Sequence, residues 1–198
     1  MNYKYTKFNI HIYAAIFSIF NSFLIAEEMI FGEEILQNGI KVVFEAAPKD
    51  TVYPEDYFLE ENETDIHIEM LMNWTSGSPE GSPSGGFIPY LNVSATIKNK
   101  KGQSNKVKLT PHLNITDNFH YAQNIKLPGE ISELYTVTIK IAPPQGNELG
   151  IHYDWKQNYQ FLVKEQSFTY EDLSFEKIAI KSRSCLLYTS PSPRDQVV

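Results

Sequence analysis

The feature that most constrains the fold is a two-residue alternation of apolar and polar side chains. Residues 91–98 read LNVSATIK, with an apolar residue at every odd position. Residues 135–141 read YTVTIKI and repeat the pattern. Side chains two apart share one face of a strand, so each stretch predicts a strand with one buried face. A turn (NKKG) follows the first stretch and the alternation resumes over 105–109, which predicts a hairpin.

Further strands are expected at four places: 40–45, 65–73, 121–127 and 158–163. About seven short antiparallel strands separated by Gly, Pro and Asn turns are typical of an all-β, immunoglobulin-like β-sandwich. We expect this domain to span residues 27–182, with no helix longer than a turn or two.

Both ends differ from the predicted domain. Residues 1–26 combine lysines with an apolar stretch too short and too interrupted for a comfortable membrane span, and they predict a signal peptide cleaved near Ala26. The alternative is an uncleaved amino-terminal anchor. Residues 183–198 lack any periodicity and are rich in Ser and Pro, so we interpret them as a non-native tail.

Charge and cysteine content exclude several classes. The chain carries 24 acidic against 17 basic residues, a net charge of −7, which argues against nucleic-acid binding and suits cation capture. Cys185 is the single cysteine, so an internal disulfide and a Cys-based zinc site are excluded. An exported chain without a cysteine framework indicates the bacterial periplasm.

Four histidines lie outside the signal peptide. His67 and Glu69 are two residues apart on a predicted strand, so they share a face and form a usable imidazole–carboxylate pair for a metal ion. His112 and His120 flank a polar loop that contains Asp117. The fourth histidine follows a Pro-rich turn. Taken singly, each is also consistent with an ordinary surface or core histidine, and spacing alone does not bring them together.

Motifs of catalysis are absent from the sequence. It has no GxSxG elbow, no HExxH pair and no glycine-rich phosphate loop. We therefore expect a protein that is not an enzyme. Two alternatives stay open: an exported structural or adhesive sandwich with incidental histidines, and a metal-dependent hydrolase, which requires an open coordination position.

Five stretches carry a resemblance to a known family. They are residues 65–69 (DIHIE), 87–93 (FIPYLNV), 111–126 (PHLNITDNFHYAQNIK), 135–144 (YTVTIKIAPP) and 150–152 (GIH), and they follow the family's order. The IPYL and HYxxNIK segments are the most specific of them. The chain resembles the periplasmic iron-transport proteins that act beside high-affinity iron permeases.

The resemblance implies an immunoglobulin-like homodimer with a copper site of three histidines and a methionine. Carried onto this chain, the histidine ligands are His67, His120 and His152. Glu69 corresponds to a glutamate that helps to hold a second ion, Fe(II), Fe(III) or Mn(II), and Asp117 corresponds to a loop aspartate. The family's methionine is absent. His112, after Pro111, takes its place if the loop has gained one residue; otherwise Leu113 occupies the position and a ligand is lost. We expect His112 to be the ligand, because the preceding proline matches the family's pattern.

Exchange of a thioether for an imidazole changes the expected metal preference. Imidazole suits Cu(II), Zn(II), Ni(II) and Fe(II), whereas a thioether favours Cu(I). We therefore expect Cu(II) and an iron-like ion, with Zn(II) as a further candidate, in a periplasmic partner of an inner-membrane iron permease. One mechanism implied by the resemblance is electron exchange between copper and iron. Because protonated imidazole does not ligate, binding is expected to weaken below about pH 6.

Overall fold

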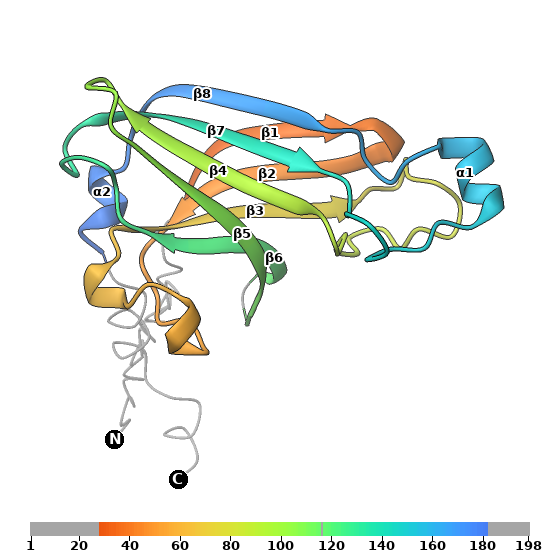
Figure 1. The fold of residues 1–198 in the computed structure, drawn as a ribbon, viewed down its shortest axis with the longest axis horizontal. Helices are drawn as coiled ribbons and strands as arrows, with labels where there is room; N and C mark the ends of the chain where they lie inside the picture. Colours follow the sequence, from red (N-terminus) through yellow and green to blue (C-terminus); the bar gives the residue numbers. More distant parts are fainter. Residues whose placement is uncertain (1–27, 116, 182–198) are drawn as a thin grey trace, which may run out of the picture.

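The computed structural model describes residues 28–115 and 117–181, so the predictions for 1–26 and 183–198 lie outside the described residues. Within these residues, eight strands form the fold, with two short α-helices (α1 and α2) and three 3-10 turns (η1–η3) between or after them (Figure 1). In chain order the elements are β1 Met29–Leu36, η1 Gln37–Gly39, β2 Ile40–Ala47, η2 Glu55–Tyr57, η3 Glu61–Glu63, β3 Ile66–Trp74, β4 Asn92–Asn99, β5 Ser104–Asn114, β6 Asn118–Ile125, β7 Leu134–Ala142, α1 Tyr153–Tyr159, β8 Gln166–Ser174 and α2 Glu176–Ala179.

All neighbouring strands pair antiparallel in the order β1-β2-β3-β6-β5-β4-β7-β8. The long strand β5 joins the two halves, because its first part pairs with β4 and its last part with β6. The two edge strands approach each other: the Phe31 and Tyr170 rings lie 5.5 Å apart, and the Tyr170 hydroxyl donates to Glu34 Oε1 at 3.2 Å. The sheet therefore curls into a nearly closed, barrel-like shape (Figure 1).

The apolar side of this curled sheet forms the core. Alternate residues of each strand point inward and are fully buried, as the two-residue period requires. The fully buried inward residues on β2, β3, β4 and β7 include Val42, Phe44, Ile68, Met70, Met72, Ala95, Ile97, Val137 and Ile139.

The predicted all-β, antiparallel class is confirmed, and strands occupy the hairpin and the segments expected around 40–45, 65–73, 121–127 and 135–141. The described residues hold eight strands, because β1 and β8 were not predicted. The strand expected at 158–163 is wrong: α1 runs into this segment and ends at Tyr159, and the following residue, Gln160, has a φ of 64°, which suits neither helix nor strand. The immunoglobulin-like sandwich stays a prediction, since the strands form one continuous, curled sheet.

The outer face of the sheet is covered near His67 by residues 48–64, the segment that carries η2 and η3 (orange in Figure 1). At the other end of β3, Trp155 of α1 packs against Trp74 with ring centroids 6.0 Å apart. Across residues 28–115 and 117–181, no helix has the length and apolar character needed to span a membrane.

Candidate metal centre

Strand register brings three histidines to one place on the outer face. His67 lies near the start of β3, on the face opposite Ile66 and Ile68. β3 pairs with β6, and β6 pairs with the end of β5, where His112 stands directly opposite His120. Directly opposed residues of antiparallel strands project from the same face, so neighbouring strands aim all three imidazoles at one volume.

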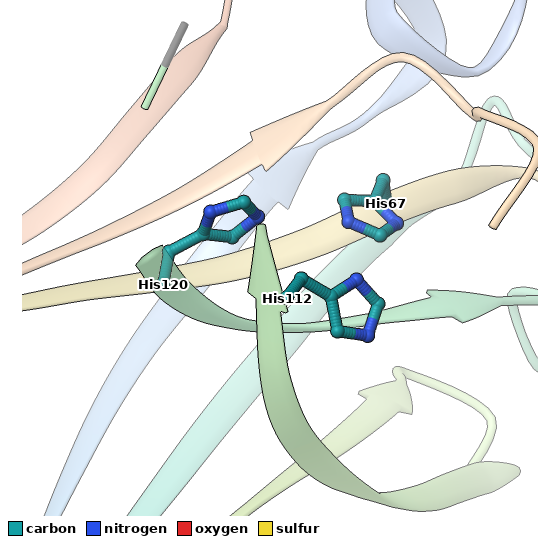
Figure 2. Close-up of side chains that lie close together, drawn as sticks. All are labelled: His67, His112 and His120. Atoms are coloured by element: carbon teal, nitrogen blue, oxygen red, sulfur yellow. The ribbon is translucent and has the colours of Figure 1, made fainter. Parts of the chain in front are cut away.

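The three rings form a compact group (Figure 2). The centroid distances are 5.2 Å for His67–His112, 6.0 Å for His112–His120 and 6.3 Å for His67–His120. One ring nitrogen from each lies within 4.8 Å of the others. All three side chains are buried, at 3%, 9% and 1% exposure in chain order. Such spacing lets three nitrogens reach one ion after small side-chain adjustments, since metal–nitrogen bonds are about 2 Å long.

Hydrogen bonding orients two of the rings. His120 Nδ1 lies 3.2 Å from the carbonyl oxygen of Asn118, which only accepts, so Nδ1 carries a proton and, in the neutral imidazole, Nε2 keeps its lone pair. His67 Nδ1 lies 2.7 Å from Asn124 Oδ1. The Nε2 atoms of His67 and His120 lie 3.6 Å and 4.0 Å from Glu69 Oε1. Both Nε2 atoms therefore face the same carboxylate.

His112 supplies the test of whether these residues fit a metal ion. Its Nε2 is buried and has no hydrogen-bond partner within the described residues. Burial, followed by the nearby His120, lowers the pKa of His112 to about 4, so its imidazole is neutral at pH 7. A buried neutral imidazole with an unpartnered nitrogen is a costly feature unless a ligand completes it. The donor set fits a transition-metal ion that accepts nitrogen ligands.

A second group of possible ligands adjoins the first. Carboxylate oxygens of Glu28, Glu69 and Asp117 lie within 4.8 Å of one another. Glu69 is fully buried and belongs to this carboxylate group, and its Oε1 also lies near the Nε2 atoms of His67 and His120, so it stands between the histidines and the other two carboxylates. Asp117 is held in the β5–β6 turn by Asn114, whose Nδ2 donates to Asp117 Oδ2 at 2.6 Å and whose Oδ1 accepts from the Asp117 backbone N–H at 2.6 Å.

Five of the six residues predicted as ligands lie in these two groups, and the structure separates the sixth from them. His152 precedes α1 and is exposed. It borders a different pocket, together with Trp74 and Trp155. Trp74 lies seven residues along β3 from His67, roughly 23 Å of extended chain at about 3.3 Å per residue. The assignment of His152 as a ligand stays a prediction.

The geometry favours His112 over Leu113 at the position of the family's methionine, and the assignment stays a prediction. His112 faces the other two histidines, whereas Leu113 points to the opposite side of β5 and is 65% exposed.

Sequence reasoning missed two acidic residues. Glu28 is the second residue after the predicted signal peptide, and Glu45 is buried on β2 opposite Glu69. For Glu45, the signal in the sequence was a charge inside an apolar strand, KVVFEAA.

The fold and site define a class: an all-β antiparallel protein with a buried histidine centre next to a carboxylate cluster. Residues 25–176 match the sequence profile of the Fe2+ transport protein family, and the chain belongs to that family. The resemblance found in the sequence is thus confirmed.

A UPF0423 protein of Brucella abortus (strain 2308) is 26% identical over 133 residues, 65% of this chain and 71% of the relative. The 34 kDa membrane antigen of Treponema pallidum (strain Nichols) is 34% identical over 94 residues, 46% of this chain and 45% of the antigen.

Solved structures give the same result for the fold. A copper-bound variant of FetP from uropathogenic Escherichia coli strain F11 is 25% identical, with a TM-score of 0.59, over 73% of this chain and 95% of FetP. A copper-bound variant of Campylobacter jejuni P19 is 23% identical, with a TM-score of 0.61, over 74% of this chain and 96% of P19. The likeness to P19 supports the fold alone.

Proposed function

We propose that this chain is an exported, periplasmic metal-binding protein that binds copper at the histidine group and assists iron uptake by a high-affinity permease of the inner membrane. The observation that carries the proposal is the convergence of three buried histidine nitrogens within 4.8 Å. Membership of the Fe2+ transport protein family and the likeness to copper-bound FetP support it. In this proposal residues 1–26 are the signal peptide and residues 27–182 form the mature immunoglobulin-like domain.

The histidine group of His67, His112 and His120 would hold the copper ion. Three neutral imidazoles provide nitrogen ligands that suit Cu(II), and Zn(II) is an alternative occupant. Bound copper would supply a redox-active centre next to the carboxylates. The chain itself contributes a fixed set of ring orientations and a buried site from which bulk water is largely excluded.

The carboxylate group would hold the second ion. Oxygen ligands suit harder ions, such as Mn(II) and iron, better than they suit Cu(I). Glu69 lies near both groups, so it would bind the second ion or orient the copper ligands. Glu45 stands opposite Glu69 and adds a further buried carboxyl group to this region.

Copper titration tests the histidine group. We expect His67→Ala, His112→Ala and His120→Ala each to weaken Cu(II) binding by more than about 100-fold, because loss of a ligand exceeds the roughly 10–100-fold effect of losing a residue that orients one. The measurement is calorimetric titration at pH 7.5, with Asn99→Leu as a control for loss of a buried polar group far from the site. If all three histidine variants bind Cu(II) with the affinity of the wild type, the proposal is contradicted.

Manganese titration of the copper-loaded protein tests the second group. Glu28→Gln and Asp117→Asn are expected to weaken Mn(II) binding, followed by electron paramagnetic resonance, while Cu(II) affinity stays unchanged. Glu69→Gln is expected to alter both, since its carboxylate adjoins both groups. Unchanged Mn(II) affinity in all three variants would remove the second ion from the proposal.

His152 fits the proposal if the protein is a homodimer. The side chain is exposed and lies away from its own chain's histidine group, so a partner chain could receive it. Exposed apolar side chains on both sides of it, Ile151 and Tyr153, suit an interface. The partner would then supply the fourth ligand to each copper site.

Mixed dimers separate the two possibilities for His152. A dimer of one His67→Ala chain and one His152→Ala chain keeps one complete site only if the ligand crosses the interface. We expect one copper ion of wild-type affinity per mixed dimer and none in either parent dimer. A mixed dimer without such a site would show that His152 does not act across the interface.

The adhesive alternative treats the histidines as incidental. Their burial argues against it, because a polar nitrogen such as His112 Nε2 is seldom buried without a partner.

A further inference from the structure

One buried amide links the histidine group to the segment that covers it. Asn124 lies on β6 directly opposite His67 on β3 and is 3% exposed. Its Nδ2 donates to two backbone carbonyl oxygens of residues 48–64: Asp50 at 2.8 Å and Leu59 at 2.9 Å. Its Oδ1 lies 2.7 Å from His67 Nδ1. Both donor hydrogens of the amide and its oxygen therefore have a partner in the protein.

These contacts fix the tautomer of His67. A carbonyl oxygen only accepts, so the end of the Asn124 amide that faces Asp50 and Leu59 has to be the NH2 group. The opposite end, facing His67, is then the oxygen, which also only accepts. His67 Nδ1 must carry a proton, so in the neutral imidazole, the form that binds a metal ion, Nε2 keeps the lone pair, 3.6 Å from Glu69 Oε1.

We infer that Asn124 is a positioning residue of the metal centre: it holds the proton of His67 on Nδ1, which leaves Nε2 for the ion, and with the same amide it fastens residues 48–64 over the site. This inference rests on the proposed function that the histidine group binds a metal ion. It concerns a residue that touches no ion itself and acts through His67.

The covering segment is part of the same arrangement. A cavity of about 340 Å³ lies between it and the three histidines, lined on the segment's side by residues 50–53 and Phe58. The Phe58 ring meets the His112 ring edge-on at 5.0 Å. Release of the segment from Asn124 would open the centre to water, so the ring orientation of His67 and the closure of the site depend on one side chain.

Three variants separate the two roles of Asn124. Asn124→Leu removes all three contacts at similar volume. Asn124→Asp keeps an oxygen acceptor for His67 but loses the donors to Asp50 and Leu59. The matched control is Asn99→Leu, because Asn99 is also 3% exposed and also has three side-chain hydrogen bonds, in the β4–β5 turn and to Glu133.

The first readout is the His67 tautomer in metal-free protein, by nitrogen-15 NMR of the imidazole. We expect protonated Nδ1 in the wild type, Asn124→Asp and Asn99→Leu, and a mixture of tautomers in Asn124→Leu. The second readout is Cu(II) affinity by titration, with an expected loss of about 10–100-fold in Asn124→Leu alone. The third is limited proteolysis of residues 48–64, which both Asn124 variants should accelerate and Asn99→Leu should not.

Three outcomes would overturn the inference: a wild-type His67 protonated on Nε2, an Asn124→Leu protein that binds Cu(II) as tightly as the wild type, or an Asn124→Asp protein that loses as much affinity as Asn124→Leu. If Asn124→Leu does not fold, the tautomer of wild-type His67 and the Cu(II) affinity of Asn124→Asp still test the inference. Failure of the proposed function differs from failure of this inference. If the histidine group does not bind copper, His67→Ala leaves Cu(II) affinity unchanged, whereas the His67 tautomer is measured without metal and does not depend on that result.

Discussion

At the scale of single residues, His112 shows how burial sets the chemistry of a side chain. The imidazole lies between Phe58 and the two other histidines, with one nitrogen unpartnered. Burial is the main reason that its pKa falls to about 4. Competition between protons and a metal ion at His112 would therefore begin near pH 4, well below the pH of about 6 expected for an ordinary histidine.

The lowered pKa of His112 predicts acid sensitivity of the metal-free protein. In the unfolded chain the pKa is about 6.5, so as the pH falls from 6.5 to 4 the unfolded state binds a proton that the folded state does not. Stability is highest above pH 6.5 and falls by up to about 3 kcal/mol by pH 4. Urea unfolding with chelator, from pH 7.5 to 4, measures it. His112→Leu should reduce the pH dependence by about one proton; an unchanged dependence in that variant would contradict the assignment.

A tyrosine of the specific HYxxNIK stretch connects two of the sequence motifs. The Tyr121 hydroxyl donates to the Ile88 carbonyl at 2.8 Å and accepts from the Leu91 backbone N–H at 3.0 Å. Burial raises the pKa of Tyr121 to about 12, so the hydroxyl keeps its proton. In this chain, one tyrosine thus bonds the loop of the 87–93 stretch to the strand of the 111–126 stretch.

Removal of that hydroxyl leaves two buried backbone groups unpaired. We expect Tyr121→Phe to lower the free energy of unfolding by about 1–3 kcal/mol. Tyr153→Phe, at an exposed tyrosine, is the control and should have little effect. Equal stability of the two variants by urea unfolding would show that the loop does not depend on Tyr121.

At the scale of elements, closure of the sheet depends on one glycine of β1. A Cβ placed on Gly32 would overlap the ring of Tyr170 on β8. The register of β1 on β2 shifts between Ile30 and Gly32, so the strand carries an irregularity where the two edges meet. The absent side chain lets Tyr170 lie across β1 and reach Glu34.

Gly32→Ala is therefore expected to destabilise the protein by about 1–3 kcal/mol through overpacking. Copper affinity should not change, because the histidine group lies on β3, β5 and β6. Gly150→Ala is the matched control, since a Cβ there meets no atom within 4 Å. A stability of Gly32→Ala equal to that of the control would mean that the two edges are not in contact in solution.

At the scale of the whole molecule, metal binding and folding are linked because the histidine group exists only in the folded chain. His67 and His120 are 53 positions apart in the sequence, and β3 must pair with β6, and β6 with β5, before their rings meet that of His112. An ion that binds the folded state alone stabilises it by about 2.7 kcal/mol at a free concentration 100 times the dissociation constant.

This linkage predicts a rise in melting temperature of about 5–10 °C when copper is added to the wild-type protein. Scanning calorimetry with and without chelator measures it. His120→Ala should show little or no rise, while Asn99→Leu, which melts earlier, should keep the full rise. A rise of equal size in His120→Ala would place the stabilising copper elsewhere on the molecule.

The sequence by itself determined the strands and most of the candidate ligands. The two-residue period predicted β4, β5 and β7 because it records which face of a strand is buried, a local property of the chain, and strands were also expected at the places of β2, β3 and β6. It missed β1 despite Asn38-Gly39, whose positive φ angles form the β1–β2 turn typical of hairpins. The motifs named five of the residues that lie in the two groups.

The tertiary structure alone decided which of those residues meet. Strand register placed His112 opposite His120, and the curl of the sheet brought β1 back toward β8. Glu28 joined the carboxylates from the start of β1, and His152 stayed away at α1. Distances across a sheet follow from hydrogen-bond pairing between strands that are remote along the chain, and spacing in the sequence does not encode that pairing.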